Sequence, residues 1–257
     1  MKFSVLSSGS GGNATLVATD SAAVLIDCGV SLKSLNQRAE TIDFDLGKLD
    51  AVLVTHEHND HAGNVAALAR RYQIPVYLTH GTALATNMWQ ERNVEVREIS
   101  PHRDFSIHDL NIKPTPVPHD AREPCQFVLE DKRERRLGIL TDIGSVTPHV
   151  EAHFQACHAL VLEFNHDVEM LANCAYPDSL KARVGGRYGH FSNDQAKALL
   201  EKIAHPNLDL IVAAHLSENS NTPDHVRSIL QDVPVDARWE IAEQHRAMPL
   251  MSLTGAD

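Results

Sequence analysis

Six consecutive residues, HEHNDH at positions 56–61, constrain this chain more than any other part of its sequence, because they follow an apolar run that predicts a buried strand. Alternate residues of an extended segment point to the same side, so His56 and His58 can reach one metal ion together. The chain then turns, and Asp60 with His61 can face a second ion. Imidazole and carboxylate groups suit borderline divalent ions such as Zn²⁺. Four ligand-type side chains within six positions therefore predict a metal site rather than a surface cluster of histidines.

The composition is that of an ordinary globular protein and predicts a single domain over residues 1–257. Hydrophobic residues make up 43% and charged residues 22% of the chain. No apolar run approaches the ~20 residues that a membrane span needs, and the start, MKFSVLSSGSGG, lacks the long apolar core of a signal peptide. The four cysteines are scattered without a CxxC pair, which favours reduced thiols over disulfides. We therefore expect a cytoplasmic protein with no membrane partner, and the sequence leaves its oligomeric state open.

The formal net charge of −11 limits the kind of nucleic-acid binding that this chain can perform. A protein that coats duplex DNA needs a broad basic face with many Lys and Arg contacts to phosphates, and this charge argues against one. The charge does not exclude an enzyme that binds one strand end, because two bound dications would dominate the local field.

Periodicity predicts two successive halves, each with strands and helices, and so a layered α/β sandwich of the helix–sheet–sheet–helix type. Strands are expected at residues 2–6, 14–18, 23–27, 51–55, 75–78, 105–107, 111–117, 126–129, 136–140, 158–163 and 208–213. Helices are expected at residues 31–39, 63–72, 82–90, 179–184, 193–203 and 223–230. Open sheets place their sites where strand ends meet loops, and this directs the search for further ligands.

The pattern His56-x-His58-x-Asp60-His61 resembles the defining HxHxDH motif of the metallo-β-lactamase superfamily. The fold of that family is a four-layer αββα sandwich with mixed sheets and with the metals at one edge. Three later residues have the order and context of the family's remaining ligands: His119 in PVPHD, Asp142 in LTDIG and His215 in AAHLS. The resemblance covers the chain from residue 7 to about residue 223.

The resemblance implies two divalent metal ions with a water or hydroxide shared between them. One ion would be held by the triad His56, His58 and His119. The other would be held by the triad Asp60, His61 and His215, and the carboxylate of Asp142 would bridge the two ions. This ligand set accepts Zn²⁺ or Mn²⁺, and also Fe²⁺. In the β-lactamases that name the superfamily the position of Asp142 is typically Cys, so we do not expect antibiotic hydrolysis.

The glycine-rich turn SSGSGGN at residues 7–13 is a candidate binding site for an anion. Its backbone N–H groups and hydroxyls can bind phosphate oxygens, which makes Ser8, Ser10 and Asn13 candidate substrate contacts. A plain flexible turn is the alternative interpretation.

Three basic residues precede the sequence GHFSN. The planar fork of arginine suits phosphate oxygens, and we expect Arg187 to contact the substrate. For Lys181 and Arg183 a solvated helix face is the favoured interpretation.

Gly-His190-Phe-Ser resembles the GHxS/T loop of RNase Z-like nucleases, and Leu-Val-Leu-Glu163 resembles their strand that ends in Glu. In those enzymes the Glu–His pair is thought to protonate the departing oxygen. An imidazolium held by a carboxylate suits that role, so Glu163 and His190 are expected to be catalytic together with Asp60. A histidine that caps the following helix is the alternative for His190.

The ordered motifs, from SSGSGGN to AHLSENSNTP, look like those of the YycJ/WalJ-like subgroup of the superfamily, and Glu163-Phe-Asn-His166-Asp167 is their most specific part. Members are regarded as metal-dependent hydrolases, with 5′-to-3′ DNA exonuclease activity proposed for the group. His166 can support a metal ligand from behind, contact substrate or cap the following helix. We favour the supporting role and also keep His166 among the candidate substrate contacts.

The sequence therefore predicts a metal-dependent hydrolase, and by its resemblance a dinuclear phosphodiesterase or nuclease that attacks with a metal-bridging hydroxide. Its partner would be nucleic acid, as a single strand or a strand end, or a small phosphodiester. A small-molecule hydrolase of a thioester, lactone or cyclic phosphate is a second hypothesis, and a non-catalytic metal-bound interaction module is a third. The sequence does not separate DNA from RNA and does not fix the polarity of attack.

Overall fold

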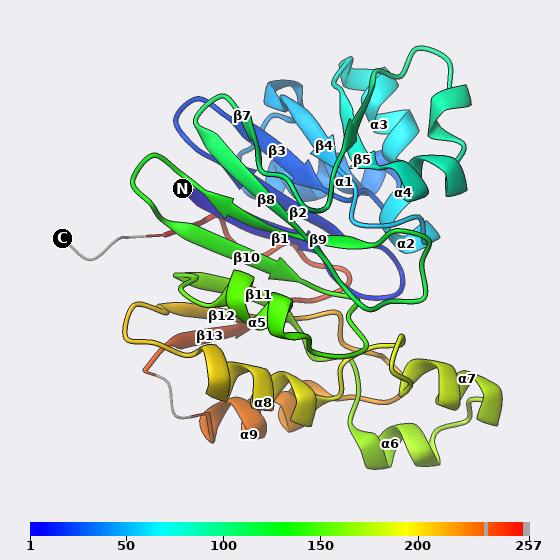
Figure 1. The fold of residues 1–257 in the computed structure, drawn as a ribbon, viewed down its shortest axis with the longest axis vertical. Coiled ribbons are helices and arrows are strands. Elements are labelled where there is room, and N and C mark those ends of the chain that lie inside the picture. The colour runs from blue at the N-terminus through cyan, green and yellow to red at the C-terminus, as the bar shows by residue number, and fades with distance from the viewer. Residues whose placement is uncertain (234–235, 254–257) are drawn as a thin grey trace.

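A computed structural model describes residues 1–233 and 236–253 and shows two sheets packed face to face, with helices on both outer faces (Figure 1). Within these described residues, each sheet has seven strands. Apart from the last strand, the first half of the chain forms one sheet and the second half forms the other. The predicted four-layer α/β sandwich with mixed sheets is confirmed.

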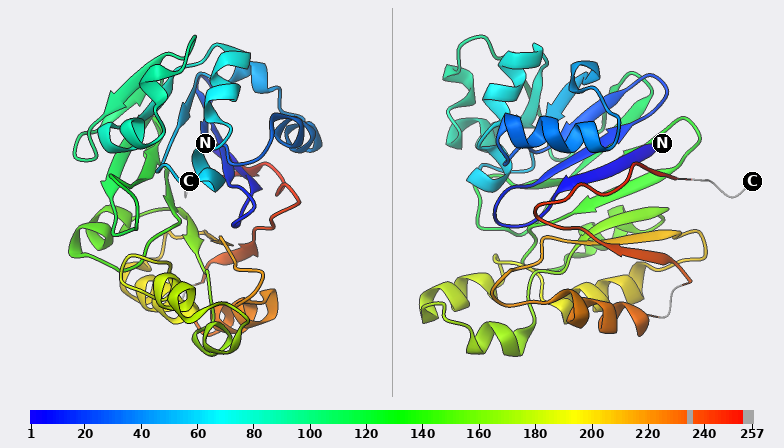
Figure 2. Two further views of the ribbon diagram at one scale, coloured as in Figure 1. Left: turned by 90° about the vertical axis from the view of Figure 1, so that its right-hand side faces the viewer. Right: turned by 180° about the vertical axis from the view of Figure 1, so that it is seen from behind.

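The first sheet has the strand order β14-β1-β2-β3-β4-β5-β6. Strands β1 to β3 are antiparallel, and β3 to β6 are parallel. Strand β14 pairs with β1, so the C-terminal segment runs along the N-terminal strand (Figure 2). The strands are β1 (Lys2–Ser7), β2 (Ala14–Ala18), β3 (Ala23–Ile26), β4 (Ala51–Leu53), β5 (Val76–Thr79), β6 (Val96–Ile99) and β14 (Met251–Ser252).

The second sheet has the order β13-β12-β11-β10-β9-β8-β7. Strands β7 to β10 are antiparallel, and β10 to β13 are parallel. The strands are β7 (Phe105–Ile107), β8 (Leu110–Pro116), β9 (Cys125–Glu130), β10 (Arg136–Leu140), β11 (Ala159–Glu163), β12 (Leu210–Ala214) and β13 (Arg238–Ile241).

Amphipathic helices cover the outer face of the first sheet. In α3 the buried residues Val65, Leu68 and Ala69 recur at helical spacing, and they pack against the sheet in the same apolar cluster as Leu35 of α1. The helical segments of this half are α1 (Leu32–Thr41), η1 (Leu46–Lys48), α2 (Asn59–Ala62), α3 (Val65–Tyr72), α4 (His80–Ala85) and η2 (Met88–Gln90).

On the other side, α8 packs Leu199, Leu200 and Ile203 onto the second sheet and begins with a capping box between Ser192 and Gln195. The helices of this half are α5 (Pro148–Phe154), α6 (Val168–Asn173), α7 (Asp178–Val184), α8 (Asn193–Ile203) and α9 (Pro223–Gln231). Helices α6 and α7 project from the sandwich at the lower right of Figure 1. No helix within the described ranges is long and apolar enough to cross a membrane.

The two sheets share an apolar core that supports one functional edge. Phe3 and Val5 of β1 pack in it with Phe127 and Leu129 of β9, and all are buried. Each such side chain stabilises the fold by about 1.5–3 kcal/mol, so the strands form a rigid frame for the loops at their ends.

The structure differs from the predicted elements in a few places. The expected continuous helix at residues 82–90 is wrong, because Asn87 has a left-handed backbone (φ 53°) that divides α4 from η2. Helices α2, α5 and α6, the short segment η1 and strands β6, β13 and β14 were not predicted. Of these, α5 carried a readable signal, because Thr147 caps it and Pro148 begins it.

Candidate metal centre and active site

The predicted metal ligands all follow strands whose carboxyl ends meet at one edge of the sandwich. The residues of the HEHNDH segment follow β4, His119 follows β8, Asp142 follows β10 and His215 follows β12. The structure brings all seven side chains into one cluster. The ligand atoms of each of three sets lie within 4.8 Å of one another: His56, His58 and His119; Asp60, His61 and His215; and His56, His61 and Asp142.

The first triad is formed by three imidazoles. Nδ1 of His58 lies 3.0 Å from Nε2 of His56 and 3.3 Å from Nε2 of His119. On the far side of its ring, His119 Nδ1 donates to the carbonyl of Gly189 at 3.0 Å. That bond places the ring proton on Nδ1 and leaves the Nε2 lone pair for a metal ion.

The second triad combines one carboxylate with two imidazoles. Oδ2 of Asp60 lies 3.5 Å from Nε2 of His61 and 3.6 Å from Nε2 of His215. His61 is fully buried, and its Nδ1 lies 2.7 Å from Oδ2 of Asp27. The sequence analysis did not assign Asp27, the last residue of the strand expected at residues 23–27, to the site. The Asp27 carboxylate also accepts hydrogen bonds from the backbone N–H and hydroxyl of Thr55, so it braces the start of the ligand loop.

Asp142 lies close to both triads, because its carboxylate is within 4.8 Å of ligand atoms of His56 in the first triad and of His61 in the second. Its Oδ2 is 3.1 Å from Nε2 of His61, and its Oδ1 is 3.5 Å from Nε2 of His215. Asp142 and His215 are both buried. Both also have a left-handed backbone conformation, with φ 53° and 57°. Such strain persists at functional sites where the surroundings hold it in place.

The donor set fits a divalent metal ion. Among the described residues, Asp142 Oδ2 and His215 Nε2 are buried polar atoms without a hydrogen-bond partner, and both lie inside the cluster. Burial alone would lower the pKa of His215, but Asp142, Asp60 and Glu163 outweigh burial and raise it to about 10. The same carboxylates that favour a charged imidazole favour a bound cation.

A second charged pair, Glu163 and His190, lies beside the cluster. Glu163 is fully buried at the end of β11, and its Oε1 lies 2.8 Å from Nδ1 of His190 and 3.0 Å from Nδ1 of His215. Its Oε2 accepts hydrogen bonds from the backbone N–H groups of Ile143 and Phe191. Burial alone would raise the pKa of Glu163, but the charge of His190 and the side-chain hydrogen bonds with His190 and His215 lower it to about 2. Burial opposes the charged form of His190, yet Glu163 raises its pKa above the usual value.

The cluster and His190 open into a cavity of about 350 Å³. His58, Asp60, Asp142, His190 and His215 line its metal-facing side. Residues of α7 and of the segment before it also line the cavity. A volume of this size is typical of a small-molecule pocket and is large enough for one nucleotide.

The predicted contacts in the glycine-rich turn have two different positions. Ser10 is exposed and lines the cavity, as expected of a substrate contact. Ser8 is buried, and its hydroxyl oxygen accepts a hydrogen bond from the backbone N–H of His215 at 2.7 Å. The amide of Asn13 lies 2.9 Å from Nε2 of His61 and 3.3 Å from the carbonyl of Asp60, so Ser8 and Asn13 hold the ligand loops.

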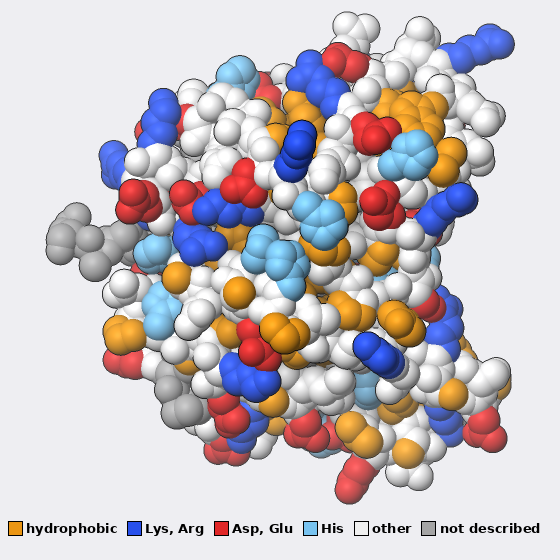
Figure 3. Space-filling view, viewed as in Figure 1, with side chains coloured by type: hydrophobic (Ala, Val, Ile, Leu, Met, Phe, Trp, Pro, Cys, Tyr) orange, Lys and Arg blue, Asp and Glu red, His pale blue; other side chains and the backbone are white. Residues whose placement is uncertain are grey.

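The structure distributes the basic residues differently from the sequence interpretation. Arg183 lines the cavity, and its Nε donates to Asp120 at 2.5 Å. Arg187 is exposed outside the described cavity lining, with its guanidinium over the ring of Tyr188. On the face shown in Figure 3, Lys and Arg side chains are interspersed with Asp and Glu, and the described residues form no continuous basic area there.

His166 is not among the described residues that line the cavity. It is buried, and its Nδ1 is 3.4 Å from Oδ1 of Asn165. The amide of Asn165 donates to the carbonyl of His215 at 3.0 Å, so His166 supports the residue that positions a candidate ligand.

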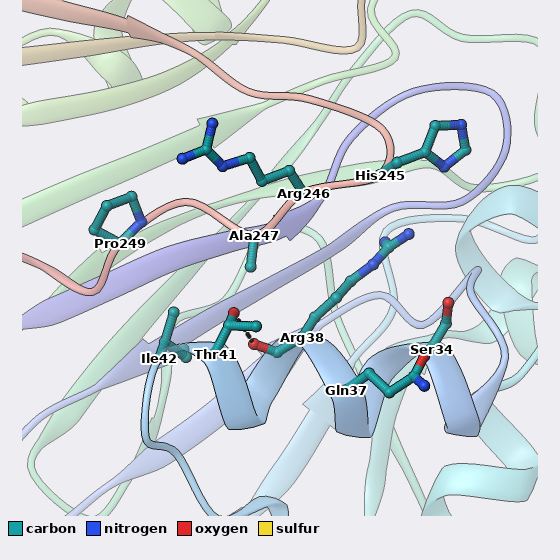
Figure 4. Close-up of a pocket in the computed structure, with 9 residues that line it drawn as sticks. All are labelled: Ser34, Gln37, Arg38, Thr41, Ile42, His245, Arg246, Ala247 and Pro249. Atoms are coloured by element: carbon teal, nitrogen blue, oxygen red, sulfur yellow. Dashed lines mark hydrogen bonds between the residues drawn. The ribbon is translucent and has the colours of Figure 1, made fainter.

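A larger hollow of about 610 Å³ lies between α1 and residues 245–249 (Figure 4). Figure 4 shows Arg38 rising from α1 towards this segment, and its guanidinium donates to the carbonyl of Leu6 at 3.3 Å. The described lining contains His245 but no Asp or Glu. The hollow therefore lacks the mixed ligand set that marks the smaller cavity as the candidate active site.

Comparison with known proteins agrees with the fold and the ligand cluster. The chain matches the family model described as "Beta-lactamase superfamily domain" over residues 22–215. The chain therefore belongs to the metallo-β-lactamase superfamily, as its motifs predicted.

Two curated relatives place the chain in the YycJ/WalJ-like subgroup. It is 31% identical over 251 residues to exodeoxyribonuclease YycJ of Bacillus anthracis, and the aligned region covers 95% of this chain and 92% of that protein. It is 32% identical over 227 residues to exodeoxyribonuclease WalJ of Streptococcus pneumoniae serotype 2, which covers 86% and 83%. The crystal structure of Zn(2+)-bound PqqB from Methylobacterium extorquens has a TM-score of 0.73 and 16% identity, covers 97% of this chain and 100% of that one, and shares the fold.

Proposed function

We propose that this protein is a phosphodiesterase that holds two divalent metal ions and removes nucleotides from the 5′ end of a DNA strand. One observation carries the proposal: His190, which is bonded to the buried Glu163, lines the same cavity as members of the metal-ligand cluster. Phosphodiester hydrolysis needs an activated water and a separate proton donor for the leaving oxygen. The names of the two relatives, both exodeoxyribonucleases, support DNA as the substrate.

The proposed ions are Zn²⁺ or Mn²⁺, and Fe²⁺ also suits the donor set. One ion would be held by His56, His58 and His119, and the other would be held by Asp60, His61 and His215. The carboxylate of Asp142 would bind both ions. When bound, such ions supply Lewis acidity, which lowers the pKa of water towards ~7 and neutralises charge on the phosphate. The zinc in PqqB supports a zinc site in this fold.

The remaining steps belong to the side chains of the protein. Glu163 keeps His190 protonated through the 2.8 Å contact, and the imidazolium of His190 donates a proton to the leaving oxygen. Asp60, whose carboxylate lines the cavity, accepts a proton from the attacking water. Asp27 and the carbonyl of Gly189 hold the rings of His61 and His119 in orientation.

The direct test is cleavage of 5′-labelled single-stranded DNA by protein loaded with Mn²⁺ or Zn²⁺. We expect labelled mononucleotides to appear before shorter strands accumulate, because the enzyme starts from the labelled end. If the 5′ label instead stays on progressively shorter strands, the enzyme degrades DNA from the 3′ end and the proposed polarity is wrong. If the loaded protein cleaves neither DNA, RNA nor bis-p-nitrophenyl phosphate, the proposed function is wrong.

A further inference from the structure

Helix α7 covers the candidate active site without forming part of the apolar core. None of its seven residues is buried. Leu180 and Val184, one helical turn apart, are half-buried, and both line the cavity. An amphipathic helix normally buries its apolar side chains against the protein, whereas here they face the space above the metal-ligand cluster. This placement leaves an apolar wall for an occupant of the cavity.

Tyr176, just before α7, extends the same wall. Its side chain lines the cavity, and its hydroxyl accepts a hydrogen bond from Nδ2 of Asn219 at 2.9 Å. Asn219 belongs to the loop that follows His215, so this bond ties the α7 segment to a ligand loop and restrains the tyrosine ring. A restrained aromatic ring at the side of a polar cavity is suited to stack on a planar group.

Arg183 adds a positive charge to this wall. Its Nε is bonded to Asp120, which itself lies 3.4 Å from Nε2 of His119 and 3.8 Å from Nε2 of His58. The guanidinium is thereby held close to the first triad. Within the described residues its two terminal nitrogens make no hydrogen bond, so they remain as donors for a phosphate.

We propose that Tyr176, Leu180, Arg183 and Val184, here called the α7 wall, bind one unpaired nucleotide of the substrate, with its base stacked on Tyr176 and its phosphate on Arg183. This inference rests on the proposed function and adds that the substrate is a single strand at the cleaved end. A base inside a duplex already has neighbours on both faces and offers none to Tyr176. Every base has an aromatic face, so the subsite tolerates any sequence.

The test compares two single-stranded DNA substrates that differ only in whether the terminal nucleotide carries a base or is abasic. Tyr176→Ala is expected to lower kcat/KM on the natural strand by roughly 10- to 100-fold, and to cleave the abasic strand as fast as Tyr176→Phe, which also loses the bond to Asn219. Tyr176→Phe keeps the ring and should retain most of the activity. Trp89→Ala removes an exposed aromatic side chain outside the described cavity lining and should change neither substrate.

Binding provides a readout that is independent of turnover. A strand with terminal 2-aminopurine, bound to the His190→Ala variant, should lose fluorescence through stacking, and adding Tyr176→Ala should abolish that quenching. Equal losses of cleavage on both strands, or quenching that persists without Tyr176, would overturn the inference. Quenching by a protein that cleaves no phosphodiester would keep the subsite and reject the proposed function. If the protein neither quenches the fluorescence nor cleaves a phosphodiester, the subsite and the proposed function are both rejected.

Discussion

Oδ2 of Asp27 lies 2.7 Å from Nδ1 of His61, so a buried carboxylate holds this imidazole on the side opposite its candidate metal-binding atom. The contact joins the residue that follows β3 to helix α2, which follows β4, and β3 and β4 are parallel neighbours in the first sheet. Asp27 has a left-handed backbone with φ 61°. The chain therefore turns sharply at the strand end and places the carboxylate where it orients a ligand without binding the ion itself.

Replacement of Asp27 tests this orienting role. Asp27→Ala should weaken metal binding by about 10- to 100-fold, because His61 loses the partner that fixes its tautomer and ring angle. The change should also destabilise the fold by about 1–3 kcal/mol, since the backbone N–H and hydroxyl of Thr55 lose their acceptor. Metal titration followed by competition with a chelator measures the first effect, and urea unfolding measures the second. Unchanged affinity in Asp27→Ala would show that His61 needs no support.

Replacement of His190 separates the proposed phosphodiesterase from a thioester hydrolase. His190→Ala should lower kcat on DNA by about 10²- to 10⁴-fold, because the leaving oxygen loses its proton donor. Hydrolysis of a thioester should change little, since a thiolate leaves without a strong acid. Metal content measured on the same preparation should equal that of the wild type. A parallel loss of bound metal would mean that His190 acts as a ligand and not as an acid.

Removal of metal should destabilise the protein. A ligand at 100 times its Kd stabilises the folded state by about 2.7 kcal/mol, and two ions contribute separately. The apo protein should in addition retain the repulsion between Asp60 and Asp142, which both face His215. Thermal unfolding before and after treatment with a chelator, and again after readdition of Zn²⁺ or Mn²⁺, measures the difference. A Tm that does not move on chelation would argue against a metal centre that couples four loops.

The acid stability of the fold should depend on Asp131, in the turn between β9 and β10. Burial alone would raise the pKa of this carboxyl, but hydrogen bonds from Arg135 and the N-terminal ammonium outweigh burial and lower it to about 2. Because the unfolded pKa is about 3.9, the stabilisation is complete above about pH 4 and is lost as the pH falls towards about 2. Asp131→Asn should flatten the stability profile in this window, as followed by urea unfolding at each pH. Parallel profiles for the two proteins would contradict this assignment.

Much of the ligand cluster could be predicted because it depends on strand ends. HEHNDH is a local signal, and His119, Asp142 and His215 each follow an apolar strand. The carboxyl ends of such strands meet at one edge of a sheet, so order along the chain is enough to expect that these residues converge. The layered fold followed from the same alternation of strands and helices.

The residues that were missed depend on contacts that no local pattern records. Asp27 reaches His61 only because β3 and β4 are neighbours in the sheet. Whether Arg183 or Arg187 contacts the cavity depends on which side of the chain around α7 faces it. Hydrophobic periodicity does not show that side, because α7 buries no residue. Tyr176 lies in a loop without a motif, so only the cavity identifies it.

The central claim is that seven side chains from four loops hold two adjoining divalent ions. Anomalous X-ray diffraction from crystals of the Zn²⁺- or Mn²⁺-loaded protein measures this directly. We expect two anomalous peaks ~3.5–4 Å apart, with the Asp142 carboxylate in contact with both ions and one histidine triad or mixed triad around each. A single peak, or His119, Asp142 or His215 turned away from the ions, would contradict the account.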